Sequence, residues 1–216
     1  AYEGNLRKHA LSVPRCISEC SGIRVFGRRI KSLVFSTDVA IIKNINADAI
    51  IAVYPFTPQP AITQAIIGVS EVPVFCGVGG GLTNGVRSAS MAAYVEHQGA
   101  YGVVCNSKIG VETIHAIKDA VEIPVVYTVI SENTDIQPYL TAGVDIINVS
   151  GAARTPEIVG ALRQRYPELP IIATGGPTEE SILATIRAGA NAITYTPPSS
   201  ASLFAKTMAG NRSELE

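Results

Sequence analysis

The sequence predicts an α/β fold: a single closed (β/α)8 barrel (a TIM barrel) with an N-terminal helical segment capping its bottom. Repeated strand starts, eight strand-then-helix modules and the composition support this prediction. Of the 216 residues, 47% are hydrophobic and 16% are charged, a balance that suits a parallel sheet covered by helices on both faces. The length fits one domain over residues 1–216, with a cap segment at 1–30 and the barrel at 31–212.

Two short signatures alternate along the chain and mark the strand starts. In the first, a proline lies between two apolar residues, as in Val72-Pro73-Val74, and it recurs at 123–125 and 169–171. Proline is tolerated at the first residue of a strand, where its missing N–H is not yet needed. In the second, a small residue leads into an apolar run, as at 143–146 and 189–193. There a glycine ends an amphipathic stretch, as a helix C-cap does.

These signatures divide the chain into eight strand-like runs. Helical patterns fill the gaps, for example at 155–166 and 178–188. Strands that alternate with helices predict parallel βαβ units. Eight units in order favour a closed barrel, and an open doubly wound sheet is the alternative. The predicted strands cover residues 31–36, 49–54, 72–76, 101–105, 125–129, 145–149, 171–174 and 192–195.

Charge and cysteine content narrow the class of protein. The net charge is −1 and no basic block is present, which argues against nucleic-acid binding. No apolar run approaches the ~20 residues of a membrane span, and the start lacks the apolar core of a signal peptide. We therefore expect a cytoplasmic protein with no membrane partner, whose low charge is compatible with a homo-oligomer. Its cysteines are expected to be free thiols: Cys16, Cys20, Cys76 and Cys105.

Several common catalytic and cofactor motifs are absent. The glycine-rich stretch 77–85 does not match G-x-G-x-x-G, because Leu82 stands at the sixth position. This stretch is either a lid or an inert connection. No Walker sequence and no G-x-S-x-G elbow occur. The histidines His9, His97 and His115 lie away from the predicted strand ends. We expect no cofactor and no metal.

The turn after the seventh strand is a candidate phosphate site. It reads Thr174-Gly175-Gly176-Pro177-Thr178. Two glycines let the backbone approach a ligand closely, and Thr178 can cap the next helix. The start of that helix offers N–H groups and partial positive charge to an anion. We predict that Gly175, Gly176 and Thr178 bind phosphate, with a tight structural turn as the alternative.

Residues 169–196 resemble the ribulose-phosphate-binding barrel superfamily. The resemblance rests on Ile171-Ile172-Ala173-Thr174-Gly175-Gly176 and on a Thr-capped helix that ends in Ala188-Gly189-Ala190. It implies a small phosphorylated metabolite as the ligand. The chain also resembles glycerol-uptake antiterminator proteins and bacterial barrels loosely labelled hydrolases. It departs from many of these families after strand eight, where Pro197 and Pro198 replace a Gly-Ser or Gly-Thr pair. Hydroxyl groups of Thr196, Ser199 and Ser200 are available as substitutes for the missing N–H groups.

Polar residues at other strand ends are candidates for chemistry, because barrel enzymes keep their reacting groups there. Asp38 follows the first strand and is either catalytic or the N-cap of a helix at 39–44. Lys108 follows the fourth strand and is either functional or solvated. Glu132, after the fifth, is the remaining carboxylate for acid–base work. Asn148 and Ser150 share one face of the sixth strand and are expected to contact a ligand.

The sequence leaves three functions open. The first is an enzyme, an isomerase, epimerase or lyase, that acts on a small phosphorylated metabolite, with Asp38, Lys108 or Glu132 moving protons. The second is a ligand-binding regulator without catalysis, which suits the sparse set of acid–base groups. The third is a hydrolase of a phosphorylated or ester substrate, with a water activated by Glu132 or Asp38.

Overall fold

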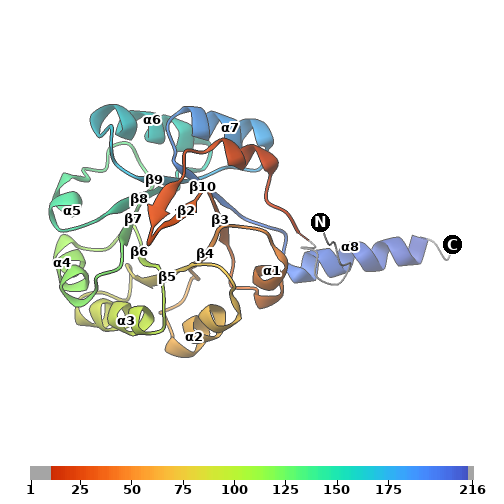
Figure 1. Ribbon diagram of the computed structural model, residues 1–216, viewed down its shortest axis with the longest axis horizontal. Coiled ribbons are helices and arrows are strands. Elements are labelled where there is room, and N and C mark those ends of the chain that lie inside the picture. The colour runs from red at the N-terminus through yellow and green to blue at the C-terminus, as the bar shows by residue number, and fades with distance from the viewer. Residues whose placement is uncertain (1–10, 214–216) are drawn as a thin grey trace.

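A computed structural model describes residues 11–213. Eight parallel strands close into a barrel in the order β10-β3-β4-β5-β6-β7-β8-β9 (Figure 1). The first strand of the barrel pairs with the last as well as with the second, which confirms the predicted closed fold. The strands are β3 (Ser32–Phe35), β4 (Ala49–Ala52), β5 (Val74–Gly79), β6 (Gly102–Cys105), β7 (Val125–Val129), β8 (Ile146–Val149), β9 (Ile171–Thr174) and β10 (Ala192–Tyr195).

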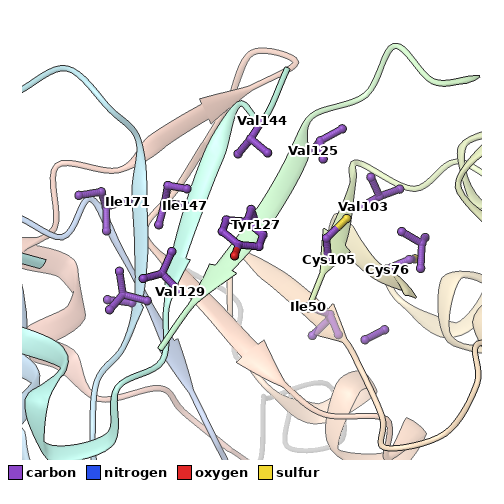
Figure 2. Close-up of a cluster of buried hydrophobic side chains, with 14 of the residues drawn as sticks. Ile50, Cys76, Val103, Cys105, Val125, Tyr127, Val129, Val144, Ile147 and Ile171 are labelled. Carbon is purple, nitrogen blue, oxygen red and sulfur yellow. The ribbon is translucent and has the colours of Figure 1, made fainter. Parts of the chain in front are cut away.

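Helices follow the strands and form the outer layer (Figure 1). Side chains on the outward faces of the strands, such as Ile50, Val125 and Ile147, are buried beneath these helices (Figure 2). The helices are α1 (Val39–Asn44), α2 (Pro60–Val69), α3 (Val86–His97), α4 (Val111–Ala120), α5 (Gln137–Thr141), α6 (Thr155–Arg165), α7 (Glu179–Arg187) and α8 (Ser200–Ser213), with a short 3-10 helix η2 (Ala152–Arg154) before α6.

The segment that covers the bottom of the barrel differs from the prediction of a helical cap. It contains one 3-10 helix, η1 (Arg15–Glu19), followed by an antiparallel hairpin of β1 (Ile23–Val25) and β2 (Arg28–Ile30). Phe26 and Gly27 form its turn with φ of 46° and 80°, as tight two-residue hairpin turns require. The predicted cap residues 1–10 lie outside the described part of the chain.

Apolar side chains of this hairpin fill the bottom of the barrel. Ile23, Val25 and Ile30 are buried in one cluster with inward-facing strand residues such as Leu33 and Phe75. Alternate hairpin residues face the barrel because side chains in a strand alternate between its two faces. The cap therefore continues the interior core of the barrel downward and closes this end.

The last helix does not complete the outer layer. Helix η1 packs against α7, and its Ile17 is 1% exposed. Helix α8 extends away from the barrel (Figure 1), and most of its residues are exposed. Helix η1 thus covers part of the barrel wall next to α7.

The cysteines and histidines take structural or surface positions. All four cysteines are buried free thiols, as predicted. Burial raises the pKa of both Cys76 and Cys105 to about 12, which leaves little thiolate at neutral pH. His97 and His115 lie exposed on α3 and α4. Within residues 11–213, we find no helix with the length and apolar character needed to span a membrane.

Candidate ligand site at the mouth of the barrel

A cavity of about 670 Å³ lies at the carboxyl ends of the barrel strands. Each of the eight strands, or the residue that follows it, contributes to the wall. The volume is in the range of small-molecule sites, and this end of a barrel is where such sites form. The side chains of Ile51 and Val104 reach both the cavity and the barrel core below it.

The barrel strands contribute two chemically different sets of side chains to the wall, and polar residues that follow β4, β5 and β6 (Thr57, Thr83 and Asn106) also line the cavity. Strands β3, β4 and β6 contribute apolar side chains from Phe35, Ile51 and Val104, and Val53 extends this half after β4. Strands β7 to β10 and the residues that follow them contribute hydroxyl and amide groups. These are Thr128, Asn148, Ser150, Thr174, Thr194 and Thr196.

The hydroxyl and amide groups of the wall are only partly hydrogen-bonded within the protein. The Asn148 Nδ2 donates to Thr128 Oγ1 at 3.3 Å. The Thr174 Oγ1 lies 3.2 Å from Thr155 Oγ1 and also donates to the Val149 carbonyl at 3.5 Å. Two buried oxygen atoms remain without a hydrogen-bond partner among the described residues: Asn148 Oδ1 and Thr194 Oγ1. Leaving such a group unpaired costs about 1–3 kcal/mol.

The structure brings three of the ten predicted site residues to this cavity: Asn148, Ser150 and Thr196. The other seven are not among the residues that line it: Asp38, Lys108, Glu132, Gly175, Gly176, Thr178 and Ser199. Among residues 11–213, no charged side chain lines the cavity.

Asp38 acts as the N-cap of α1. Its Oδ1 accepts hydrogen bonds from the backbone N–H groups of Ala40 at 3.0 Å and Ile41 at 3.3 Å. Its Oδ2 accepts from the Ser200 N–H at 3.0 Å, which ties α1 to the start of α8. Hydrogen bonding from Ser200, followed by the N–H groups of α1, lowers the pKa of Asp38. The capping alternative is the one that the geometry supports.

Glu132 and Lys108 have surroundings typical of surface residues. Glu132 forms an ion pair with Arg154 of η2. Hydrogen bonds from its own backbone N–H and from Arg154 lower the pKa of Glu132, which makes it a weak base. Lys108 is exposed, and its backbone N–H donates to the Asn106 side chain.

The turn formed by residues 175–178 uses two of its N–H groups, those of Gly175 and Thr178, within the protein. Gly175 N–H donates to the Thr194 carbonyl at 3.2 Å. Thr178 and Ser181 form a reciprocal capping box at the start of α7. A Cβ on Gly175 would lie 2.7 Å from Ile182, and Gly176 has φ of +76°. Both glycines therefore have structural reasons for being there.

The glycine-rich stretch after β5 is tied to its neighbours. Gly80 N–H donates to the Thr83 carbonyl at 2.8 Å, and Gly85 N–H donates to Thr113 Oγ1 at 3.0 Å. A Cβ on Gly80 would lie 2.4 Å from Asn106 Cβ. Close packing of β5 against β6 accounts for this glycine, while Leu82 is 97% exposed at the rim of the cavity.

Sequence reasoning missed the three threonines of β7, β9 and β10. Thr128, Thr174 and Thr194 stand two residues after inward-facing Val126, Ile172 and Ala192. The alternation of side chains along a strand was the signal that could have identified them. Within residues 11–213, no group of three or more His, Cys, Asp or Glu residues could hold a metal ion.

Comparisons with known proteins show the fold. No family model matches the chain, and no curated protein matches it. Among solved structures, the chain is similar to a candidate phosphonomutase from Burkholderia cenocepacia J2315, with a TM-score of 0.65, 18% identity, and coverage of 86% of this chain and 92% of the other. It is also similar to a phosphonopyruvate hydrolase in complex with oxalate and Mg²⁺, with a TM-score of 0.65, 15% identity, and coverage of 85% and 80%.

A third similar structure is a phosphoenolpyruvate phosphomutase from Streptomyces platensis subsp. rosaceus, with a TM-score of 0.63, 15% identity, and coverage of 84% and 80%. At such low identities these likenesses define a class of architecture, because one barrel fold hosts many unrelated functions. The chain is a (β/α)8-barrel protein. The resemblance of its last quarter to ribulose-phosphate-binding barrels is matched by these structures only at the level of the barrel.

Proposed function

We propose that this protein binds a small organic metabolite in the cavity at the mouth of the barrel. The pair of unpartnered buried oxygens on Asn148 and Thr194 carries the proposal. Buried polar groups in proteins are almost always hydrogen-bonded. Asn148 and Thr194 line a cavity large enough for a ligand, so a ligand that draws either side chain toward it recovers the cost of burying an unpaired oxygen.

The same cavity favours binding over acid–base catalysis. Its polar wall consists of hydroxyl and amide groups, which do not ionise near neutral pH and so are poor general acids and bases. The carboxylates nearest to the strand ends, Asp38 and Glu132, are held by a helix start and by Arg154. The ligand-binding regulator without catalysis is therefore the function that this site supports best.

A binding experiment with two variants tests the proposal. A library of small metabolites is screened against the protein by thermal shift and ligand-detected NMR. Asn148→Leu and Thr194→Val each remove one unpaired oxygen from the wall, and each is expected to weaken the hits about tenfold. Thr185→Val is the matched control, since Thr185 is a buried threonine that bonds to Ser181 within α7. Binding that survives both cavity variants, or the absence of any hit, would contradict the proposal.

An enzyme that acts on a small phosphorylated or acidic substrate is the second candidate. Its support is the likeness to phosphonomutase and phosphonopyruvate hydrolase structures. In this case the isomerase, lyase or hydrolase reactions that the sequence leaves open would take place at the same mouth. Incubation of the protein with phosphonates and sugar phosphates, followed by ³¹P NMR, tests it. Turnover that Asn148→Leu abolishes would favour the enzyme over the regulator.

A further inference from the structure

Helix α8 carries an apolar stripe that is mostly uncovered within residues 11–213. Ala201, Phe204, Ala205 and Met208 stand at i, i+3, i+4 and i+7, so they lie along one side of the helix. The two alanines are exposed, and Phe204 is 69% exposed. A helix of 14 residues is only marginally stable in water without packing, so we expect the stripe to contact another surface.

The place of a last helix on the barrel wall, between α7 and α1, is already filled. Helix η1 packs against α7. The outward side chains of β3 and β10, Val34 and Ile193, are buried in the same cluster as Cys16 and Ile17 of η1. The barrel therefore has no bare apolar wall there for α8 to cover, and an identical second copy has none either.

Most of the other exposed apolar side chains lie at the mouth of the barrel. Residues 11–213 contain eight exposed large hydrophobic side chains, and six of these lie at or after the carboxyl ends of barrel strands. Three of the six, Phe35, Phe56 and Leu82, line the cavity, and we name these three the apolar collar. Exposed polar residues such as Thr57 and Asn84 lie beside them in the sequence. Apolar surface bordered by polar residues is typical of an interaction site.

The loop after β5 holds Leu82 outward. Gly80 N–H donates to the Thr83 carbonyl at 2.8 Å, and Asn84 Nδ2 donates to the Gly81 carbonyl at 2.6 Å. Leu82 lies inside this hydrogen-bonded turn and is almost fully exposed. Turning Leu82 inward would break these bonds, so covering it requires a surface from outside the loop.

We propose that the chain forms a symmetric dimer in which α8 of each copy packs its apolar stripe on the apolar collar of the other. Two-fold symmetry repeats the same contact twice, so one association covers both surfaces in both copies. The chain supplies both surfaces itself, which favours a second copy over a foreign partner. Neither the stripe nor the collar carries a charge, and the net charge of −1 gives little repulsion between copies.

The shape of the molecule is compatible with this arrangement. Helix α8 begins at Ser200, whose N–H is bonded to Asp38 at the carboxyl end of the barrel. It extends away from its own barrel (Figure 1) for about 21 Å, which gives it the reach to contact a second one. In the dimer, each α8 then lies over the opening of the other copy's cavity, so each cavity is closed only when two copies associate.

Sedimentation velocity of the ligand-free full chain tests the dimer. A species with the mass of two chains is expected. Phe204→Ser and Leu82→Ser each remove an apolar contact that occurs twice, so each should raise the dimer Kd at least about tenfold. Phe26→Ser is the matched control, because Phe26 is 64% exposed on the cap hairpin at the other end of the barrel; it should leave the Kd unchanged. A monomer at every concentration, or a dimer that either stripe or collar variant leaves intact, would overturn the inference.

Cross-linking tests which surfaces meet. All four native cysteines are buried, so a short bismaleimide reacts chiefly with introduced ones. A Phe204→Cys chain mixed with a Leu82→Cys chain should give a linked pair, whereas Phe204→Cys mixed with Phe26→Cys should not. Phe204→Cys chains that link to one another and not to Leu82→Cys would place α8 against α8 and contradict the collar contact. Both experiments are done without ligand, so their failure leaves the proposed binding function standing.

Discussion

Replacing Thr194 by valine should make the unliganded protein more stable. The Thr194 side chain is buried, with the residue 6% exposed and its Oγ1 unpaired. Valine has nearly the same shape and no hydroxyl. An unpaired buried hydroxyl costs about 1–3 kcal/mol, of which we expect about 1 kcal/mol to be recovered in the variant. For a chain of 216 residues, this corresponds to a rise in Tm of about 2–4 °C.

Calorimetry and urea denaturation of the ligand-free protein measure this change. Thr174→Val provides the contrast, because its hydroxyl contacts Thr155 Oγ1 at 3.2 Å; this variant should lose about 1 kcal/mol. The opposite signs at two threonines of one cavity wall distinguish an unpaired group from a paired one. A lower Tm for Thr194→Val than for the wild type would refute the reasoning, and with it the claim that this position is kept polar for a ligand.

Four other variants probe the fold and the residues outside the sets of cavity threonines already described. Asp38→Ala should lower the free energy of unfolding by about 1 kcal/mol at pH 7, because α1 loses its N-cap. The pKa of Asp38 is lowered in the folded protein, so its stabilising contribution is present above the unfolded pKa of about 3.9 and is lost as the pH falls through the folded pKa. Urea titrations should therefore show the stabilities of the wild type and the variant converging in acid. Gly80→Ala should lower the stability by more than about 1–2 kcal/mol, because φ of Gly80 is +108° and the new Cβ would clash with Asn106. Gly68→Ala in α2 is the contrast: Gly68 has open space around it, so thermal melts should show a stabilisation of up to about 1 kcal/mol. Glu132→Gln should leave the Kd of any cavity ligand unchanged in calorimetric titration, and a change above about threefold would return Glu132 to the site.

The alternation of proline and glycine signatures was sufficient to predict the barrel. Predicted strands at 171–174 and 192–195 coincide with β9 and β10, because each start carries a backbone constraint that is visible in the sequence. The hairpin was missed because β1 and β2 have three residues each, too few to show a period. Its turn contains Phe26, which rarely adopts a positive φ.

The candidate site was predicted less completely, for a different physical reason. The sequence favours Asp38 and Glu132 as catalytic residues because their side chains can carry charge at strand ends. In the structure, Asp38 accepts hydrogen bonds from the N–H groups of α1, and Glu132 forms an ion pair with Arg154. The sequence alone does not show that these partners lie within reach. Threonine inside a strand, by contrast, is common on grounds of β-propensity alone, so Thr194 did not stand out.

The hairpin at the bottom has a consequence for the proposed binding function. Ile23, Val25 and Ile30 fill the amino-terminal end of the barrel, so a ligand of the cavity would enter and leave at the carboxyl end. One bound molecule would then have to leave before the next could enter. Phe56 and Leu82 are exposed at the opening of the cavity. Substitutions of these two side chains should therefore change the association and dissociation rates of a ligand together.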